Sequence, residues 1–237
     1  MTVIAYATDI HGDVHIFEKL FREAEQKRIK AILIGGDVFP EFDVVLQRAF
    51  IREYLIPRLT SFQKRIQKPV YLILGNDDFM INIDLLEQAH NKKLLFFLHN
   101  KVTTFETHSL IGYGFVNRTP FHFPDWEKDD DVIFKELMTL AKKQQPEETI
   151  LVAHVPPSNS KLDVLYDGSF VGSSGIRQFI ETWGPHFAFF GHIHESPEMS
   201  GAWKEKIGKT LCINPGNGNI VIANLHDQND IRRISKF

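Results

Sequence analysis

The chemistry that this sequence suggests lies in two short segments in which ligand-type side chains stand two positions apart. The two pairs are Asp9 with His11, and His192 with His194. Each pair closely follows an apolar run typical of a buried strand, residues 3–7 in the first case and 187–190 in the second. Side chains alternate between the two faces of a strand, so residues i and i+2 can converge on one ion. The two pairs therefore predict a metal site at the edge of a sheet.

Three further apolar runs, at residues 31–34, 70–74 and 149–153, also predict buried strands. Each leads into a residue of ligand type, and these residues are Asp37, Asn76 and His154. Amphipathic helices alternate with the runs, which is typical of a parallel sheet with both faces buried. Open α/β sheets bind ligands at the carboxyl ends of their strands, so we expect all of these side chains at one edge.

Length and composition limit the classes of protein that fit. The chain has 237 residues, of which 43% are hydrophobic, and we expect one domain over residues 1–237. The net charge is −3 and basic clusters are no longer than pairs, which argues against a surface for long nucleic acid. We find no secretory signal and no run of about 18 apolar residues that would cross a membrane. Cys212 is the only cysteine, and a cytoplasmic location is expected.

Several elements between the strands can also be assigned. Residues 43–61 predict a helix that Pro57 must break or kink, because proline removes a donor and clashes with the preceding turn. Residues 101–114 predict two strands joined by a turn at His108–Ser109, and residues 117–131 predict a functional or mobile loop. Asp131 is expected to cap the next helix, and the tail from Ile207 to Lys236 alternates like a β-meander.

The five strand-end segments, taken in order, resemble the motifs of the calcineurin-like metallophosphoesterase family. The resemblance spans residues 5–216, and the segments at 154–157, 171–173 and 191–195 resemble more narrowly the Icc-like phosphoesterase branch. It implies an α/β fold, a four-layer α/β/β/α sandwich in which two mixed sheets are flanked by helices. It also implies a metal-dependent phosphoesterase that uses a metal-bridging hydroxide as its nucleophile, with phosphodiesters favoured over phosphomonoesters.

The resemblance assigns the candidate ligands to two divalent ions. One ion would be held by Asp9, His11, Asp37 and His194, and the other by Asp37, Asn76, His154 and His192, with Asp37 bridging. Imidazole and carboxylate ligands suit Mn, Fe, Zn or Ni, among which we favour Mn. Candidate catalytic residues are Asn76, His154 and Asp77. The expected substrate is a small phosphoester, and a nucleotide is one candidate. The oligomeric state stays open.

Asp77 departs from the family pattern, in which many members have histidine. That histidine would protonate the leaving group or contact the phosphate. A carboxylate beside two cations has a depressed pKa and is a poor proton donor, so we expect Asp77 to contact a substrate hydroxyl or to orient neighbouring ligands. We also expect a preference for esters whose leaving group needs little protonation.

Some alternatives remain open. A protein-interaction scaffold with little catalysis is the rival from another class, as in the retromer subunit that resembles this family. His122, within the aromatic loop, could face substrate. The segment Gly172–Gly175 could cap a helix or offer backbone N–H groups to a phosphate. The remaining histidines are interpreted as ordinary surface or helix residues, namely His15, His90, His99, His108, His186 and His226.

Overall fold

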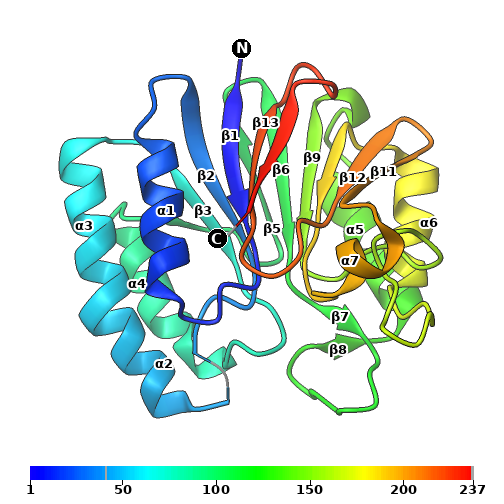
Figure 1. The fold of residues 1–237 in the computed structure, drawn as a ribbon, viewed down its shortest axis with the longest axis horizontal. Coiled ribbons are helices and arrows are strands. Elements are labelled where there is room, and N and C mark those ends of the chain that lie inside the picture. The colour runs from blue at the N-terminus through cyan, green and yellow to red at the C-terminus, as the bar shows by residue number, and fades with distance from the viewer. Residues whose placement is uncertain (41, 236–237) are drawn as a thin grey trace.

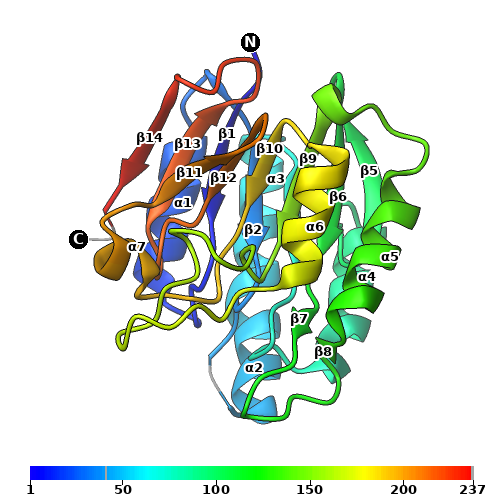
Figure 2. The same ribbon diagram turned by 90° about the vertical axis from the view of Figure 1, so that its right-hand side faces the viewer.

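Two six-stranded sheets pack face to face in the computed structural model, which describes residues 1–40 and 42–235 (Figures 1 and 2). The order of strands in the first sheet is β14 (Ile231–Ile234), β13 (Ile220–Asn224), β1 (Val3–Ala7), β2 (Ile29–Gly35), β3 (Val70–Ile73) and β4 (Phe96–Phe97). Strands β1 to β4 run parallel, and β13 pairs antiparallel with both β1 and β14.

The second sheet is also mixed. Its order is β11 (Lys204–Ile207), β12 (Thr210–Ile213), β10 (Phe187–Phe189), β9 (Thr149–Ala153), β6 (His108–Tyr113) and β5 (Lys101–Phe105). The four central strands are parallel and the two edge strands are antiparallel to their neighbours. A separate two-stranded sheet joins β7 (Val116–Asn117) to β8 (Glu127–Lys128).

Helices cover the outer faces of both sheets (Figures 1 and 2). The first sheet is covered by α1 (Val14–Ala24), α2 (Val44–Phe50), α3 (Ile56–Arg65) and α4 (Ile83–Asn91). The second is covered by α5 (Asp130–Ala141) and α6 (Ser174–Trp183), and a short helix, α7 (Ser196–Ser200), precedes β11. This four-layer arrangement confirms the predicted fold class. Within the described part of the chain, no helix has both the length and the apolar character of a membrane span.

The core between the sheets links the two strands that lead to the paired ligand types. Tyr6 of β1 and Phe189 of β10 are fully buried, with ring centroids 4.9 Å apart. The Tyr6 hydroxyl donates a hydrogen bond to the carbonyl of Phe190 at 2.9 Å. Burying an aromatic side chain stabilises the fold by roughly 1.5–3 kcal/mol, so this contact helps to hold the two sheets together at β1 and β10. Asp9 lies two residues after β1, and His192 lies three residues after β10.

Pro57 is accommodated without a break in the helical chain. Residues Ile51–Leu55 form a π-helical turn between α2 and α3, and Pro57 lies in the first turn of α3. The wider turn absorbs the missing proline N–H and the clash of its ring with the preceding carbonyl, as π-bulges commonly do. The predicted interruption at Pro57 therefore takes the form of a local widening.

Two local predictions were wrong. The turn between β5 and β6 lies at Glu106–Thr107 rather than His108–Ser109, and Glu106 has a left-handed φ of 52°. Helix α5 begins at Asp130, so Asp131 lies in its first turn instead of capping it. The predicted loop at 117–131 has no helix or strand between Asn117 of β7 and Glu127 of β8, and the buried Trp126 anchors it; its functional or mobile character stays a prediction.

The tail is not one meander. Strands β11 and β12 form a hairpin in the second sheet, whereas β13 and β14 form a hairpin in the first. Residues 214–219 cross from one sheet to the other. Alternating hydrophobicity identifies strands correctly but does not specify which sheet a hairpin joins.

Candidate metal centre

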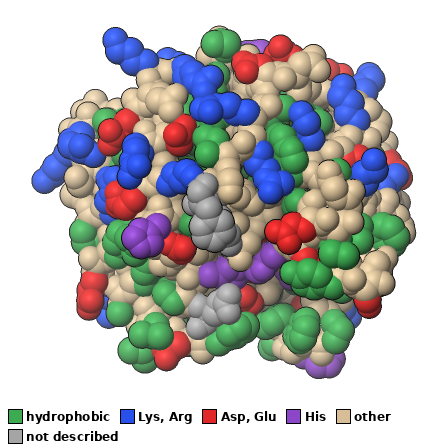
Figure 3. Space-filling view, viewed as in Figure 1, with side chains coloured by type: hydrophobic (Ala, Val, Ile, Leu, Met, Phe, Trp, Pro, Cys, Tyr) green, Lys and Arg blue, Asp and Glu red, His purple; other side chains and the backbone are tan. Residues whose placement is uncertain are grey.

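The seven candidate ligands all follow the carboxyl ends of parallel strands, and six of them form two groups. Asp9 and His11 follow β1, Asp37 follows β2, Asn76 follows β3, His154 follows β9, and His192 and His194 follow β10. Histidine side chains gather accordingly at the lower centre of the face in Figure 3. The ligand atoms of the first group lie within 4.8 Å of one another, and this group is Asp9, His11, Asp37 and His194. A second group with the same spacing contains Asp37, His154 and His192. Asp37 is thus shared.

Four of these side chains stand on strained backbone. Asp9, His11, Asp37 and His192 have left-handed φ values of 52°, 48°, 48° and 67°. Such a conformation costs a non-glycine residue roughly 1–3 kcal/mol and persists where the surroundings enforce it. The enforcing contacts are backbone hydrogen bonds between neighbouring loops, since Asp9 N–H donates to Gly36 and His11 N–H to Asp37, each at 3.0 Å.

His154 is held in one tautomer. Its Nδ1 lies 2.9 Å from the carbonyl oxygen of Gly35, an acceptor, so Nδ1 carries the proton and donates. Nε2 consequently faces Asp37, whose Oδ2 is 3.1 Å away. This arrangement, in which one ring nitrogen is fixed by the backbone and the other points into a carboxylate site, is typical of metal-ligating histidines.

The atoms inside the site fit a divalent cation. His11 Nε2 lies 3.3 Å from His194 Nε2, and His194 Nε2 lies 3.2 Å from Asp9 Oδ1. Among the described residues, no hydrogen-bond partner reaches the buried Asp9 Oδ2 or Asn76 Oδ1. Buried acceptors without donors are costly unless another group satisfies them. A donor set of carboxylate, amide oxygen and imidazole suits Mn, Fe, Zn or Ni.

Asp77 contacts three of the candidate ligands. Its Oδ1 accepts a hydrogen bond from Asn76 Nδ2 at 2.8 Å, and Asn76 Oδ1 has no hydrogen-bond partner among the described residues. Its Oδ2 lies 3.9 Å from His11 Nδ1, and its backbone N–H donates to Asp37 Oδ1 at 2.9 Å. A role for Asp77 in orienting ligands stays a prediction, which these contacts allow.

The charges of the site are strongly coupled. Burial raises the pKa of Asp37, but the neighbouring His154 outweighs it and the net shift is downward; the pKa of Asp9 is lowered in the same way by His194. Burial lowers the pKa of His154 and His194, yet Asp37 and Asp9 raise them to about 10 and about 9. Burial lowers the pKa of His192 to about 4. The potential that holds protons on two histidines is the same potential that would attract cations.

Asp78 is a site residue that we did not predict. It is fully buried, and its carboxylate accepts hydrogen bonds from the backbone N–H groups of Val38, Phe39 and Gly75 at 2.9–3.0 Å. It therefore joins the loop carrying Asp37 to the loop carrying Asn76. Burial, reinforced by Asp37, raises the pKa of Asp78 to about 8, and the three backbone bonds oppose that shift.

Asn214 secures the other side of the site. Its Nδ2 donates to the carbonyls of Gly191 and Ile193 at 3.3 and 3.1 Å, and its Oδ1 accepts from Gly216 N–H at 3.0 Å. The loop that carries His192 is therefore fixed by hydrogen bonds from the Asn214 side chain and not by strand pairing.

Other sequence-based candidates lie in different settings. In the segment Gly172–Gly175, Ser173 caps α6. The backbone N–H of Gly175, a candidate donor to a phosphate, instead donates to Asp130 Oδ1 at 3.0 Å. His122 is exposed and has a left-handed φ of 57°. His99 and His108 are buried, not surface or helix residues as predicted.

The chain belongs to the calcineurin-like phosphoesterase family, whose model matches residues 2–196. This family uses divalent metal ions, and the His and Asp groups described above could bind a dinuclear site. An uncharacterized protein of Methanocaldococcus jannaschii, MJ1162, is 27% identical over 215 residues, which cover 88% of this chain and 85% of the relative.

Two solved structures support the fold. One superposes with a TM-score of 0.74 at 18% identity, covering 99% of both chains. The other is TT1561 of Thermus thermophilus, with a TM-score of 0.69 at 16% identity, covering 100% of this chain and 99% of that one. Both are similar in architecture at low sequence identity.

Proposed function

We propose that this protein is a dinuclear metal-dependent phosphoester hydrolase that prefers phosphodiesters to phosphomonoesters. The observation that carries the proposal is the pair of ligand groups that share Asp37. Mn is the favoured ion. Two divalent ions held there would supply an activated water and neutralise charge on the phosphoryl oxygens.

The protein's own residues have separate tasks in this proposal. Asp37 would be the ligand common to both ions, and Asp78 fixes the loops on either side of it by accepting their backbone N–H groups. His154 presents Nε2 because Gly35 holds its Nδ1. Asn76 contributes a neutral oxygen, which leaves more positive charge for the substrate than a carboxylate would. Its orientation depends on Asp77.

Asp77 supports the preference for diesters. A phosphomonoester has a second pKa of about 6 and is largely a dianion at neutral pH, whereas a phosphodiester is a monoanion. The Asp77 carboxylate, only 3.9 Å from His11 Nδ1, repels the dianion more strongly. An ionised Asp77 also cannot protonate a leaving group, which favours esters of acidic alcohols.

The test is metal analysis combined with hydrolysis. Protein that has been stripped and reloaded with Mn should contain two ions per chain. It should hydrolyse bis(p-nitrophenyl) phosphate with a higher kcat/KM than p-nitrophenyl phosphate. Asp37→Ala should lose both ions and activity, because it removes the ligand common to both groups. Glu106→Gln, on an exposed residue of the β5–β6 turn, is the matched control and should change neither.

The outcomes separate the enzyme from the scaffold. Hydrolysis by the parent protein that disappears in a folded Asp37→Ala variant supports the enzyme. Bound metal without hydrolysis of either ester by the parent protein would overturn the proposal in favour of a metal-binding scaffold. A higher kcat/KM for the monoester would overturn only the diester preference.

A further inference from the structure

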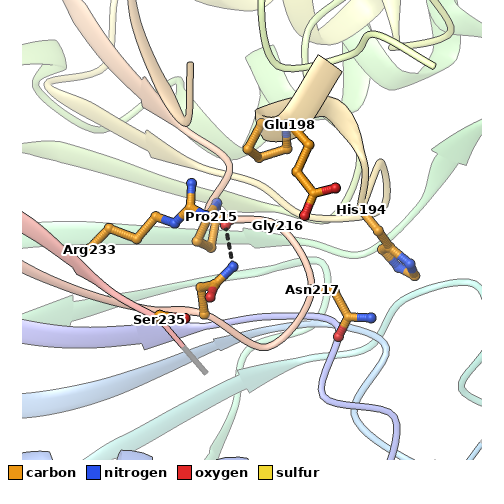
Figure 4. Close-up of a pocket in the computed structure, with 9 residues that line it drawn as sticks. His194, Glu198, Pro215, Gly216, Asn217, Arg233 and Ser235 are labelled. Atoms are coloured by element: carbon orange, nitrogen blue, oxygen red, sulfur yellow. Dashed lines mark hydrogen bonds between the residues drawn. The ribbon is translucent and has the colours of Figure 1, made fainter. Parts of the chain in front are cut away.

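A small polar pocket adjoins the candidate metal centre on the side of α7 and β14 (Figure 4). Its volume is about 140 Å³, and His194 lies in its wall. Because a water molecule needs roughly 10–15 Å³ of such space, the pocket holds about ten non-hydrogen atoms. A group of that size, attached to an ester bound at His194, could extend into it.

Arg233 is the cation of this pocket. Its side chain reaches from β14 toward Pro215 (Figure 4) and is half-buried. Burial lowers the pKa of the Arg233 guanidinium, against the opposing effect of Glu198. Within residues 1–40 and 42–235, no carboxylate or carbonyl pairs with this guanidinium. A partly desolvated cation without a direct partner favours binding of an anion.

The neighbouring arginine is different. Arg232 is exposed on the same strand, and its guanidinium lies 3.4 Å from Glu23 Oε2. Successive side chains of a strand point to opposite faces, so Arg233 faces the pocket while Arg232 faces α1. The two arginines provide a matched pair for an experiment.

The wall nearer the metal centre presents oxygen acceptors and an amide. Glu198 extends its carboxylate toward the space beside His194, and Asn217 lies below it (Figure 4). Hydroxyl groups on a short spacer would find acceptors there, while the end of the pocket near Arg233 suits an anion. Polar recognition of this kind fixes the orientation of a small ligand.

We propose that the pocket lined by His194, Glu198 and Arg233 binds a second anionic group of the substrate, separated from the scissile phosphoester by a short hydroxylated spacer. The class of substrate is therefore a phosphorylated polyol or nucleotide with a second phosphate or carboxylate. This inference rests on the proposed function for the position of the scissile ester, because His194 is a candidate ligand.

The test compares two non-hydrolysable probes, pentane-1,5-bisphosphonate and pentane-1-phosphonate, binding to the Mn-loaded protein by titration calorimetry. Charge-assisted hydrogen bonds to arginine predict about a 10- to 100-fold tighter Kd for the bisphosphonate. Arg233→Met should remove that advantage, Arg233→Lys should retain part of it, and Arg232→Met should retain all of it. Melting temperatures verify that each variant is folded.

The outcomes distinguish this proposal from the proposed hydrolase. An advantage that depends on Arg233, in a protein that hydrolyses no ester, upholds the pocket and overturns the hydrolase. Hydrolysis with equal affinities for both probes, or with an advantage that persists in Arg233→Met, overturns the pocket and leaves the hydrolase standing. Failure of both probes to bind also overturns the pocket.

Discussion

The two ends of the sheet sandwich both gather histidines, but only one end resembles a metal site. At the carboxyl ends of the strands, His154 and His194 face the buried carboxylates of Asp37 and Asp9 at 3.1 and 3.2 Å. At the opposite end, His108 and His226 lie with ring centroids 5.0 Å apart. In the described ranges, that end brings no three ligand-type atoms together.

The difference lies in the carboxylates. At the opposite end, Glu106 is exposed and is linked to His226 through the hydroxyl of Thr2. Burial and the neighbouring His226 lower the pKa of His108, whereas Asp37 raises the pKa of His154 to about 10. Neighbouring histidines are therefore insufficient for a strong cation site, and shared buried carboxylates provide the attraction.

The largest expected effect is from Gly75→Ala. A Cβ at this position would lie 2.3 Å from Asp37 Oδ1 and 2.6 Å from His154 Nε2, so both side chains would have to move. Changing the orientation of metal ligands lowers metal affinity by up to about 100-fold, and the substitution would move Asp37, which belongs to both ligand groups. Competition with a fluorescent chelator measures the affinity. Unchanged affinity in a folded variant would contradict the arrangement, and Glu106→Gln is the control at the other end.

The second effect is proton release when metal binds. His154 and His194, with pKa values of about 10 and about 9, are protonated at pH 7 and must lose those protons to ligate. Affinity should rise with pH by up to about 100-fold per pH unit between pH 6 and 8, which corresponds to two released protons. Calorimetry in buffers of different ionisation enthalpy counts the protons. Binding without release would show that these two histidines do not ligate.

The third prediction concerns Asp77, whose carboxylate lies beside the candidate metal ligands. Asp77→His should raise kcat/KM for alkyl esters relative to aryl esters by about 10-fold, because imidazole can protonate a leaving group near neutral pH. Asp77→Asn is the control, since it removes the charge without supplying an acid. The ratio of the two kcat/KM values is the measurement, and an unchanged ratio in Asp77→His would count against our interpretation.

The contrast between the two ends also explains which features the sequence could predict. Asp9, Asp37 and His154 were found because parallel strands deliver their carboxyl ends to one edge, a regular consequence of topology. Asp78 was missed because its carboxylate serves backbone N–H groups from another loop, and no local pattern marks such contacts. The tail was predicted as one β-meander, and its division between the two sheets was missed because alternating hydrophobicity does not specify the sheet that a hairpin joins.

The histidines outside the site show the same limit. His108 lies at the first position of β6, and the ring of His226, from the turn that follows β13 in the other sheet, packs 5.0 Å from its ring. The alternation of polar and apolar residues along one strand does not reveal which distant segments pack against its end. Burial at sheet ends therefore has to come from the packing of distant segments.

The smallest predicted effect tests whether the opposite end is merely structural. His108 is 4% exposed, and no hydrogen-bond partner within the described residues reaches either ring nitrogen, a cost of about 1–3 kcal/mol. His108→Phe should therefore stabilise the protein by about 1 kcal/mol at pH 7.5, after allowing for the larger ring. His15→Gln, at an exposed position of α1, should change stability by less than about 0.5 kcal/mol. Urea unfolding measures both.

The effect of His108→Phe on stability should also depend on pH. The pKa of His108 is below its ordinary value of 6.5 in the folded protein, so the unfolded chain binds the extra proton first. Above pH 6.5 the titration of His108 does not reduce the free energy of unfolding, and as the pH falls below 6.5 protonation of the unfolded chain reduces it. Besides His226, the charged groups near His108 are His186, Glu106 and Glu148. The advantage of His108→Phe should grow between pH 7.5 and 5.5, because phenylalanine cannot be protonated. A variant that is less stable at both pH values would mean that His108 has a favourable partner, such as a bound ion, and that the two ends are more alike than their carboxylates indicate.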